Sequence, residues 1–226
     1  MYDAAYGYEV AHIVQDGIER MYGGNHPDPD VMYYLTVYNE PMRQPAEPED
    51  VDVEGIRKGL HRVSVGSGDG QRVQLLASGV GVPWAIEAQE LLLSDWGVSA
   101  DVWSVTSWTE LRRDGLAADE HNFLHPEEEP RTAYLTEKLK DAQGPFIATS
   151  DYMHAVQDQI RQWVPGAYYT LAPTASASPT HVPPRAGSSR STARRWWCVR
   201  CRLWPTRAAS TGRSWVRRSR STTCTT

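Results

Sequence analysis

Cysteine is absent from the first 171 of the 226 residues, and acidic residues and lysine are absent from the last 55. Without cysteine, the first part can form neither a disulfide framework nor a thiolate metal site. The sequence also has no apolar run near the roughly 20 residues that a membrane-spanning helix needs. The residues that follow Met1 do not resemble a signal peptide. We therefore expect a cytoplasmic protein that does not contact a membrane.

Charge divides the sequence after Leu171. All 28 acidic residues lie in residues 1–171 beside 12 Lys and Arg, whereas residues 172–226 carry 11 Arg. The net charge of −5 is therefore the sum of two unlike segments, of net charge −16 and +11. The basic segment has few aliphatic residues, so burial cannot offset the conformational entropy it would lose on folding. We expect residues 172–226 to form a disordered tail.

Hydrophobic spacing predicts alternating strands and helices. Before a proline-rich linker at residues 39–52, the pattern indicates a helix at 3–22, with Asp3 as its cap and Gly23 at its end, and a strand at 31–38. After the linker, strands are expected at residues 73–77, 102–106, 146–149 and 168–171. Helices are expected at residues 53–62, 83–96, 109–124 and 131–141, with one more ending at Pro165. This order predicts a three-layer α/β fold with helices on both faces of a parallel sheet.

Two apolar stripes follow from these helices. Trp84, Ala88, Leu91 and Leu92 form the stripe expected to face the sheet. On the first helix, the expected stripe is Val10, Ile13, Val14 and Ile18. We expect this second stripe to be left without cover, which would favour aggregation of the isolated chain.

Few residues in the first part suggest chemistry. His121 and His125 have the spacing of two metal ligands on a helix, but solvated imidazoles at a helix end are the favoured interpretation. The segment Ser78–Gly81 follows a strand, where a phosphate could bind, yet a tight turn explains it better. Asp151 is interpreted as a helix cap and Glu127–Glu129 as a solvated loop. We therefore assign no catalytic, cofactor-binding or metal-binding residue.

The tail contains two further patterns. Cys198 and Cys201 form a single CxxC pair, and Cys224 alone cannot complete a four-ligand zinc site. Residues 194–218 are rich in arginine and tryptophan, a composition that could bind nucleic acid. The favoured interpretation is that this segment was never selected for a function, so we do not expect it to bind nucleic acid.

Four longer motifs lie in the first part of the sequence, at residues 2–10, 16–23 with 33–41, 101–115 and 148–153. The longest of them reads DVWSVTSWTELRRDG. In this order they resemble the C-terminal part of the homodimeric, bacterial type of pyruvate dehydrogenase E1 component, a thiamine diphosphate-dependent enzyme organised like transketolase. The resemblance covers residues 2–171.

The resemblance implies three segments. Residues 1–52 correspond to the end of the middle, pyrimidine-binding domain and its linker, and residues 53–171 to an incomplete transketolase-like C-terminal domain. In the family, the groups that hold thiamine diphosphate and Mg²⁺ precede these segments, so this chain alone is expected to be inactive. Tyr38, Asn39 and Glu40 would lie nearest the active centre. The implied partners are a second E1 subunit and the lipoyl-bearing E2 component.

The resemblance also bears on residues 172–226. Back-translation of Ala172–Pro184 with a one-base shift permits the family's continuation, a stretch similar to Gly-Thr-Asp-Gly-Phe-Gly-Phe. We therefore hypothesise a frameshift near the Leu171 codon, in the gene or in its reading. The alternative function is a stand-alone α/β binding module whose basic tail contacts nucleic acid or acidic partners.

Overall fold

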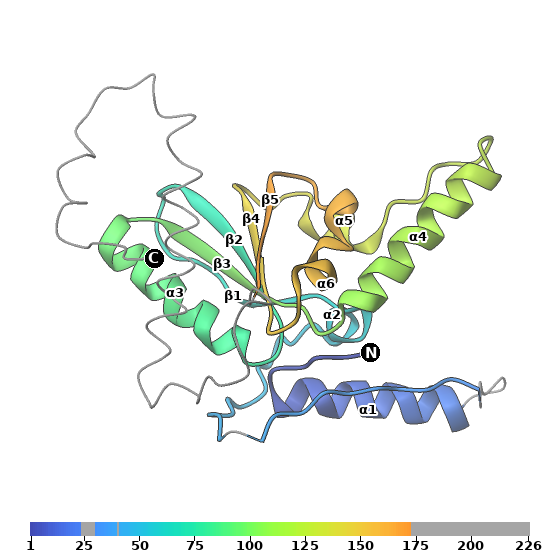
Figure 1. The fold of residues 1–226 in the computed structure, drawn as a ribbon, viewed down its shortest axis with the longest axis horizontal. Coiled ribbons are helices and arrows are strands. Elements are labelled where there is room, and N and C mark those ends of the chain that lie inside the picture. Colours follow the sequence, from blue (N-terminus) through green and yellow to red (C-terminus); the bar gives the residue numbers. More distant parts are fainter. Residues whose placement is uncertain (24–29, 40, 173–226) are drawn as a thin grey trace.

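The computed structural model describes residues 1–23, 30–39 and 41–172 (Figure 1). The longer helices are α1, α3 and α4, at Gly7–Tyr22, Gly81–Trp96 and Trp108–Leu124. Shorter helices are α2, α5 and α6, at Val53–Lys58, Tyr134–Leu139 and His154–Asp158, and a 3₁₀ turn covers Arg161–Trp163. The strands are β1 to β5, at His61–Ser64, Arg72–Ala77, Ser99–Ser104, Phe146–Thr149 and Tyr168–Leu171. Residues 24–29 lie outside the described residues, as does the predicted disordered tail from Pro173 onward.

The five strands form one sheet in the order β1-β3-β2-β4-β5. β2 to β5 run parallel, as predicted, and β1 joins the edge antiparallel to β3. The expected helix at residues 53–62 was therefore too long. It ends at Lys58 because Gly59 adopts a left-handed conformation with φ of 103°, after which the chain enters β1.

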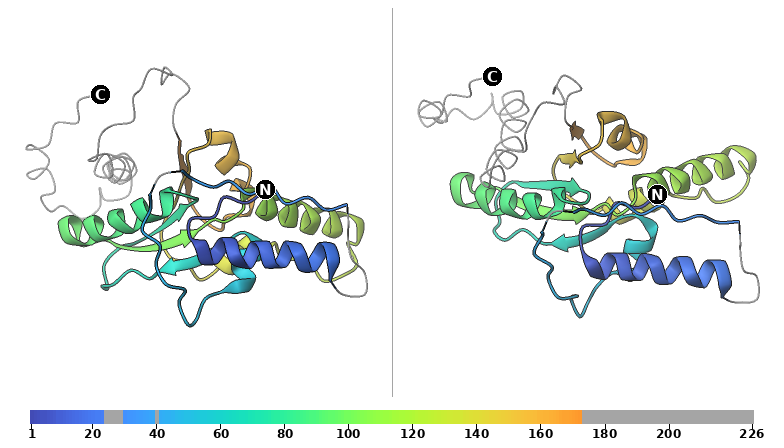
Figure 2. Two further views of the ribbon diagram at one scale, coloured as in Figure 1. Left: turned by 90° about the horizontal axis from the view of Figure 1, so that it is seen from below. Right: turned by 60° about the horizontal axis from the view of Figure 1, so that its bottom comes forward.

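Helices cover both faces of this sheet, which confirms the predicted α/β class (Figure 2). On one face, α3 packs over Leu75, Val102 and Ile147. On the other, α4, α5 and α6 bury Leu76, Trp103, Phe146 and Ala148. Side chains of successive strand residues point to opposite faces, so each strand contributes to both cores. No helix in the described part of the chain is long and apolar enough to cross a bilayer.

The segment before α1 runs along the carboxyl edge of the sheet. Asp3 is not the predicted cap of α1, because the helix begins at Gly7 and Asp3 is buried. The N–H of Asp3 donates to the carbonyl oxygen of Thr106 at 2.7 Å, and its own carbonyl oxygen accepts the N–H of Gly79 at 3.1 Å. Residues 1–6 therefore occupy the end of the sheet at which parallel α/β proteins commonly bind ligands.

The predicted strand at residues 31–38 is not formed. Leu35 makes a single parallel bridge with Tyr2, and the rest of the segment is extended without a sheet partner. Its aromatic and β-branched composition favours a strand, but a strand forms only where a neighbouring strand supplies hydrogen bonds. The predicted end of α1 is confirmed, since Gly23 is its C-cap.

Both predicted stripes are partly wrong. In α1, the stripe was expected to be uncovered, but Ile13 is only 1% exposed, whereas Val14 and Ile18 are 42% and 57% exposed, as expected. In α3, Ala88 and Leu92 are buried as predicted, but Leu91 is exposed and Trp84 is only partly buried. The glycine and alanine residues that complete the buried face of α3 allow the helix to approach the sheet closely.

Candidate functional site

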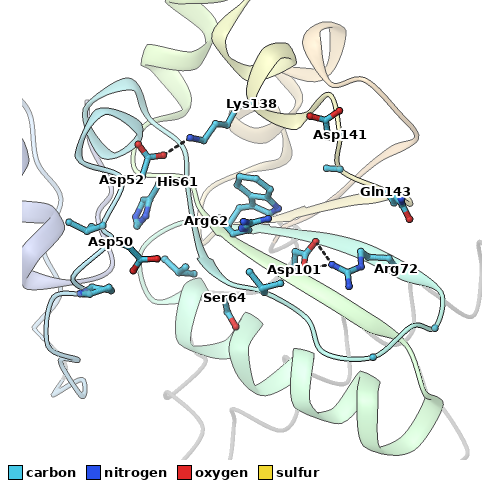
Figure 3. A pocket seen from close by; sticks show the side chains of 18 of the residues that line it. Asp50, Asp52, His61, Arg62, Ser64, Arg72, Asp101, Lys138, Asp141 and Gln143 are labelled. Atoms are coloured by element: carbon cyan, nitrogen blue, oxygen red, sulfur yellow. Dashed lines mark hydrogen bonds and ion pairs between the residues drawn. The ribbon is translucent and has the colours of Figure 1, made fainter.

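A cavity of about 910 Å³ opens beside the edge strand β1, on the face of the sheet that α5 covers only in part (Figure 3). Its walls come from the linker before α2, from β1, from the loop between β1 and β2, and from the residues around α5. The polar side chains that line it include Asp52, Arg62, Arg72, Asp101 and Lys138. These residues are far apart in the sequence, and only the fold brings them together.

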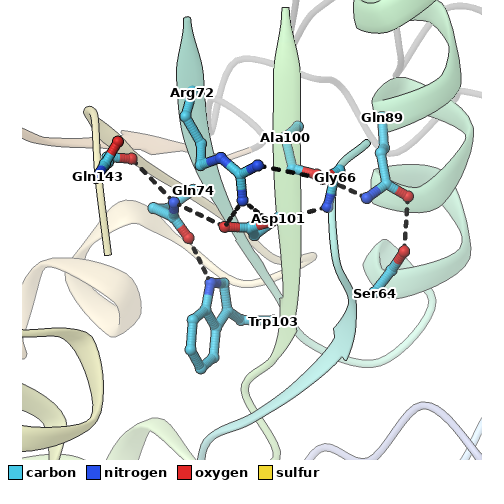
Figure 4. A network of polar contacts seen from close by, with 9 residues as sticks. All are labelled: Ser64, Gly66, Arg72, Gln74, Gln89, Ala100, Asp101, Trp103 and Gln143. Carbon is cyan, nitrogen blue, oxygen red and sulfur yellow. Dashed lines mark hydrogen bonds and ion pairs between the residues drawn. The ribbon is translucent and has the colours of Figure 1, made fainter. Parts of the chain in front are cut away.

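Asp101 is the centre of the polar network on the cavity floor (Figure 4). Its carboxylate accepts hydrogen bonds from Arg72 at 3.1 and 3.2 Å, from Gln74 at 3.1 Å and from the backbone N–H of Gly66 at 2.8 Å. Gln74 in turn accepts the indole N–H of Trp103 at 2.7 Å. The network fixes β2, β3 and the β1–β2 loop to one another, and it satisfies a carboxylate that is almost fully buried.

The remaining cations of the cavity differ in their partners. Nζ of Lys138 lies 2.5 Å from Oδ2 of Asp52. Burial raises the pKa of Asp52, but hydrogen bonds from Lys138 and the Gly55 N–H outweigh this effect, so the pKa lies below its ordinary value. The guanidinium carbon of Arg62 lies 5.6 Å from the centroid of the Trp103 ring. Among the described residues, Arg62 has no acidic partner within 4 Å. The guanidinium of Arg62 is therefore the group best placed to meet an anion.

The cavity does not have the arrangement of an acid–base or nucleophilic site. Ser64 donates its hydroxyl to Oε1 of Gln89 at 2.8 Å, and an amide oxygen does not act as a general base. His61 is buried, and its Nε2 lies 2.6 Å from Oε1 of Glu9. The arrangement can bind and orient a polar group, but it does not place a base beside a nucleophile. Sequence reasoning missed this cavity, because no local motif marks residues that come from separate elements.

The turn Ser78–Gly81 is the tight strand-to-helix turn that was predicted. The N–H groups of Gly79, Gly81 and Val82 donate to the carbonyl oxygens of Asp3, Ser78 and Gly79. The Tyr38 ring closes over the turn, and a Cβ added to Gly79 would lie 2.1 Å from the Tyr38 hydroxyl. Because these N–H groups already have acceptors, the turn does not form a phosphate cradle.

The other sequence candidates are distributed over the molecule. Asp151 does not cap α6, because that helix begins at His154 with Met153 as its N-cap. Tyr38 is partly buried and donates its hydroxyl to Asp3 at 2.9 Å beside the sheet edge. His121 and His125 lie at the far end of α4. Glu40 and all residues of the cysteine and arginine–tryptophan patterns lie outside the described residues.

Residues 59–172 match the transketolase-like TK C-terminal domain model, and residues 1–45 match the pyruvate dehydrogenase E1 component middle domain model. The chain therefore belongs to the transketolase-like C-terminal domain family. It is similar to the pyruvate dehydrogenase E1 component of Mycolicibacterium smegmatis, with 54% identity over 172 residues, covering 75% of this chain and 18% of the relative. The relative from Escherichia coli K12 is 46% identical over 173 residues, covering 76% and 19%.

These matches confirm the resemblance inferred from the sequence. The chain spans about a fifth of the length of the curated relatives it matches. A solved transketolase mutant from Pichia stipitis aligns over 76% of this chain and 20% of its own, with 15% identity and a TM-score of 0.48.

Thiamine diphosphate and Mg²⁺, which this family implies, do not fit the groups at the carboxyl edge of the sheet. The turn that would face a diphosphate has its N–H groups bound to carbonyl oxygens, and Tyr38 covers it. In the cavity beside β1, the carboxylates of Asp52 and Asp101 are bound by cationic side chains. We therefore assign no step of thiamine chemistry to the described residues.

Proposed function

We propose that this chain supplies the C-terminal part of a cytoplasmic pyruvate dehydrogenase E1 component. Residues 1–52 would be the end of the middle domain with its linker, and residues 53–171 the C-terminal domain. The complete enzyme would decarboxylate pyruvate with thiamine diphosphate and Mg²⁺ and reductively acetylate the lipoyl group of E2. It would act as a homodimer.

The observation that carries this proposal is the continuous similarity over 172 residues to the M. smegmatis E1 component. The structure supports a joint role for the two segments, because Asp3 and Glu9 of the first segment bind Gly79 and His61 of the second. We infer that these residues position and assemble the enzyme rather than react with substrate.

The alternative of a nucleic-acid-binding module depends on arginines of residues 173–226, outside the described part of the chain. None of the relatives reported above supports it, and no contact among the described residues favours it. We retain the enzyme-component proposal alone.

A chimera tests the proposal. Residues 1–172 of this chain replace the matching 172 residues of the M. smegmatis enzyme, and thiamine-dependent pyruvate decarboxylation is measured. We expect the chimera to be active and the truncated parent, which lacks those residues, to be inactive. A folded, dimeric chimera with no more activity than the truncated parent would reject the proposal. A second chimera with Met153→Gln, at an exposed position, is the matched control and should equal the first.

A further inference from the structure

The end of α4 carries a cluster of metal-ligating side chains well away from the cavity beside β1. His121 and His125 lie one helical turn apart, and their ring centroids are separated by 4.8 Å. Helix α4 projects away from the sheet, so this cluster is at the tip of the projection (Figure 1). Two imidazoles at this spacing on a helix can bind one metal ion together.

The turn after α4 brings two carboxylates to the same point. Oε2 of Glu128 lies 3.2 Å from Nε2 of His121, and Oε1 of Glu128 lies 3.6 Å from Nδ1 of His125. Oε1 of Glu127 lies 4.0 Å from the same nitrogen of His125. Within the described residues, His125, Glu127 and Glu128 are the one group whose ligand atoms all lie within 4.8 Å of one another.

Two of these separations are near the spacing of ligands around a tetrahedral ion. Bonds of about 2.0–2.1 Å to nitrogen and oxygen place neighbouring ligand atoms roughly 3.3 Å apart. Glu128 lies 3.2 Å from His121 through Oε2 and 3.6 Å from His125 through Oε1, so each distance involves a different carboxylate oxygen. Rotation of the exposed side chains of His125, Glu127 and Glu128 would bring them to one ion beside His121.

Contacts around the cluster hold it in place. The side chain of Asn122 accepts the N–H of Arg131 at 2.7 Å and donates to its carbonyl oxygen at 2.9 Å, which closes the turn against the helix. The side chain of His121 is only 13% exposed, and its Nδ1 is buried without a hydrogen-bond partner among the described residues. Packing therefore fixes the His121 ring before a metal ion binds.

We propose that His125, Glu127 and Glu128, joined by His121 as a fourth ligand, form a binding site for a divalent transition-metal ion. Zinc fits best, because it accepts mixed imidazole and carboxylate ligation in four-coordinate geometry. Mg²⁺ and Ca²⁺ prefer oxygen ligands alone and are poor candidates. The ion would fasten the turn to α4, independently of the proposed enzyme role.

Titration of the full chain with Zn²⁺ alone tests the site. The chain carries C198S, C201S and C224S, so that sulfur ligands of the tail cannot contribute. We expect one ion to bind per chain by calorimetry. We also expect Co²⁺ to give absorption bands of nitrogen and oxygen ligation. His125→Ala should weaken binding by about tenfold or more, and Glu128→Gln should also weaken it. His125 is exposed, so its replacement should leave the fold intact by circular dichroism.

His12 provides the matched control, because its Nε2 lies 2.7 Å from Glu47 without a second imidazole beside it. His12→Ala should leave the zinc affinity unchanged. A chain that binds no Zn²⁺, or one whose affinity is unaltered by both His121→Ala and His125→Ala, would overturn the proposal. Equal weakening by His12→Ala and His125→Ala would also overturn it, because binding would then be spread over surface histidines.

Discussion

Nε2 of His61 lies 2.6 Å from Oε1 of Glu9, and the two side chains are 2% and 0% exposed. The other carboxylate oxygen of Glu9 accepts the N–H groups of Ala5 and Tyr6 at 2.6 and 2.9 Å. A single carboxylate therefore joins the start of α1 to the first residue of β1. Its hydrogen bonds satisfy a charged group that burial alone would strongly disfavour.

Glu9→Ala is expected to destabilise the chain by about 3–5 kcal/mol, because it leaves a buried imidazole and two N–H groups without acceptors. Glu9→Gln keeps one acceptor oxygen and should cost less. Urea unfolding measures both free energies. A double-mutant cycle with His61→Ala should show that the two single losses are not additive. Additive losses would show that the contact contributes nothing to stability.

Gly79 and Gly97 both have left-handed backbone conformations, with φ of 51° and 63°. A Cβ at Gly79 would lie 2.1 Å from the Tyr38 hydroxyl, whereas nothing lies within 4 Å of a Cβ at Gly97. Gly97→Ala should therefore cost only the conformational strain of about 1–2 kcal/mol. Gly79→Ala should cost clearly more, and adding Tyr38→Phe to the Gly79→Ala variant should restore part of the lost stability. Thermal unfolding of the three variants would contradict this account if the two glycine changes cost the same.

Asp52 gives the chain a pH-dependent contribution to stability. Its pKa is lower in the folded state than in the unfolded state, so the contribution is present above about pH 4 and is lost as the pH falls through the folded-state value. Asp52→Asn keeps the oxygen that caps the Gly55 N–H and removes the charge beside Lys138. Because the pair is about one-third exposed, we expect a loss of only about 0.5–1 kcal/mol at pH 7.

That loss should shrink toward zero at pH 3, as measured by urea unfolding across the pH range. Glu90→Gln, at an exposed position of α3, is the control and should change stability little across the pH range. A loss for Asp52→Asn that stays constant down to pH 3 would contradict the assignment.

The exposed apolar face of α1 should promote self-association of the chain. Val14 and Ile18 are 42% and 57% exposed, on a shallow surface hollow that also includes Val10. Val14→Gln with Ile18→Gln should reduce concentration-dependent association in sedimentation velocity experiments. Met153→Gln removes an even more exposed apolar side chain, outside α1, and should have no such effect. A chain that is monomeric at all concentrations would contradict this prediction.

Local sequence patterns correctly located the strands that pair with a parallel neighbour in the sheet. β4 and β5 have the predicted bounds, because each apolar run ends at turn residues and pairs with a parallel neighbour. β1 was missed because His61–Ser64 contains one apolar residue and follows a helical pattern. The segment at residues 31–38 was wrongly predicted as a strand, because composition does not reveal that its sheet partner is limited to Tyr2.

The candidate sites were less predictable than the fold. Glu9 and His61 are 52 residues apart, and Arg72 and Asp101 are 29 residues apart, so no spacing rule connects them. The histidine pair on α4 was visible in the sequence. The approach of Glu128 was not, because it depends on the turn that Asn122 closes.

Calorimetric titration of the purified 226-residue chain with thiamine diphosphate and Mg²⁺ tests the central proposal most directly. If this chain supplies only the C-terminal part of an E1 component, the titration should show no saturable binding, while the active chimera binds the cofactor. Stoichiometric binding of thiamine diphosphate by the chain alone would contradict the account.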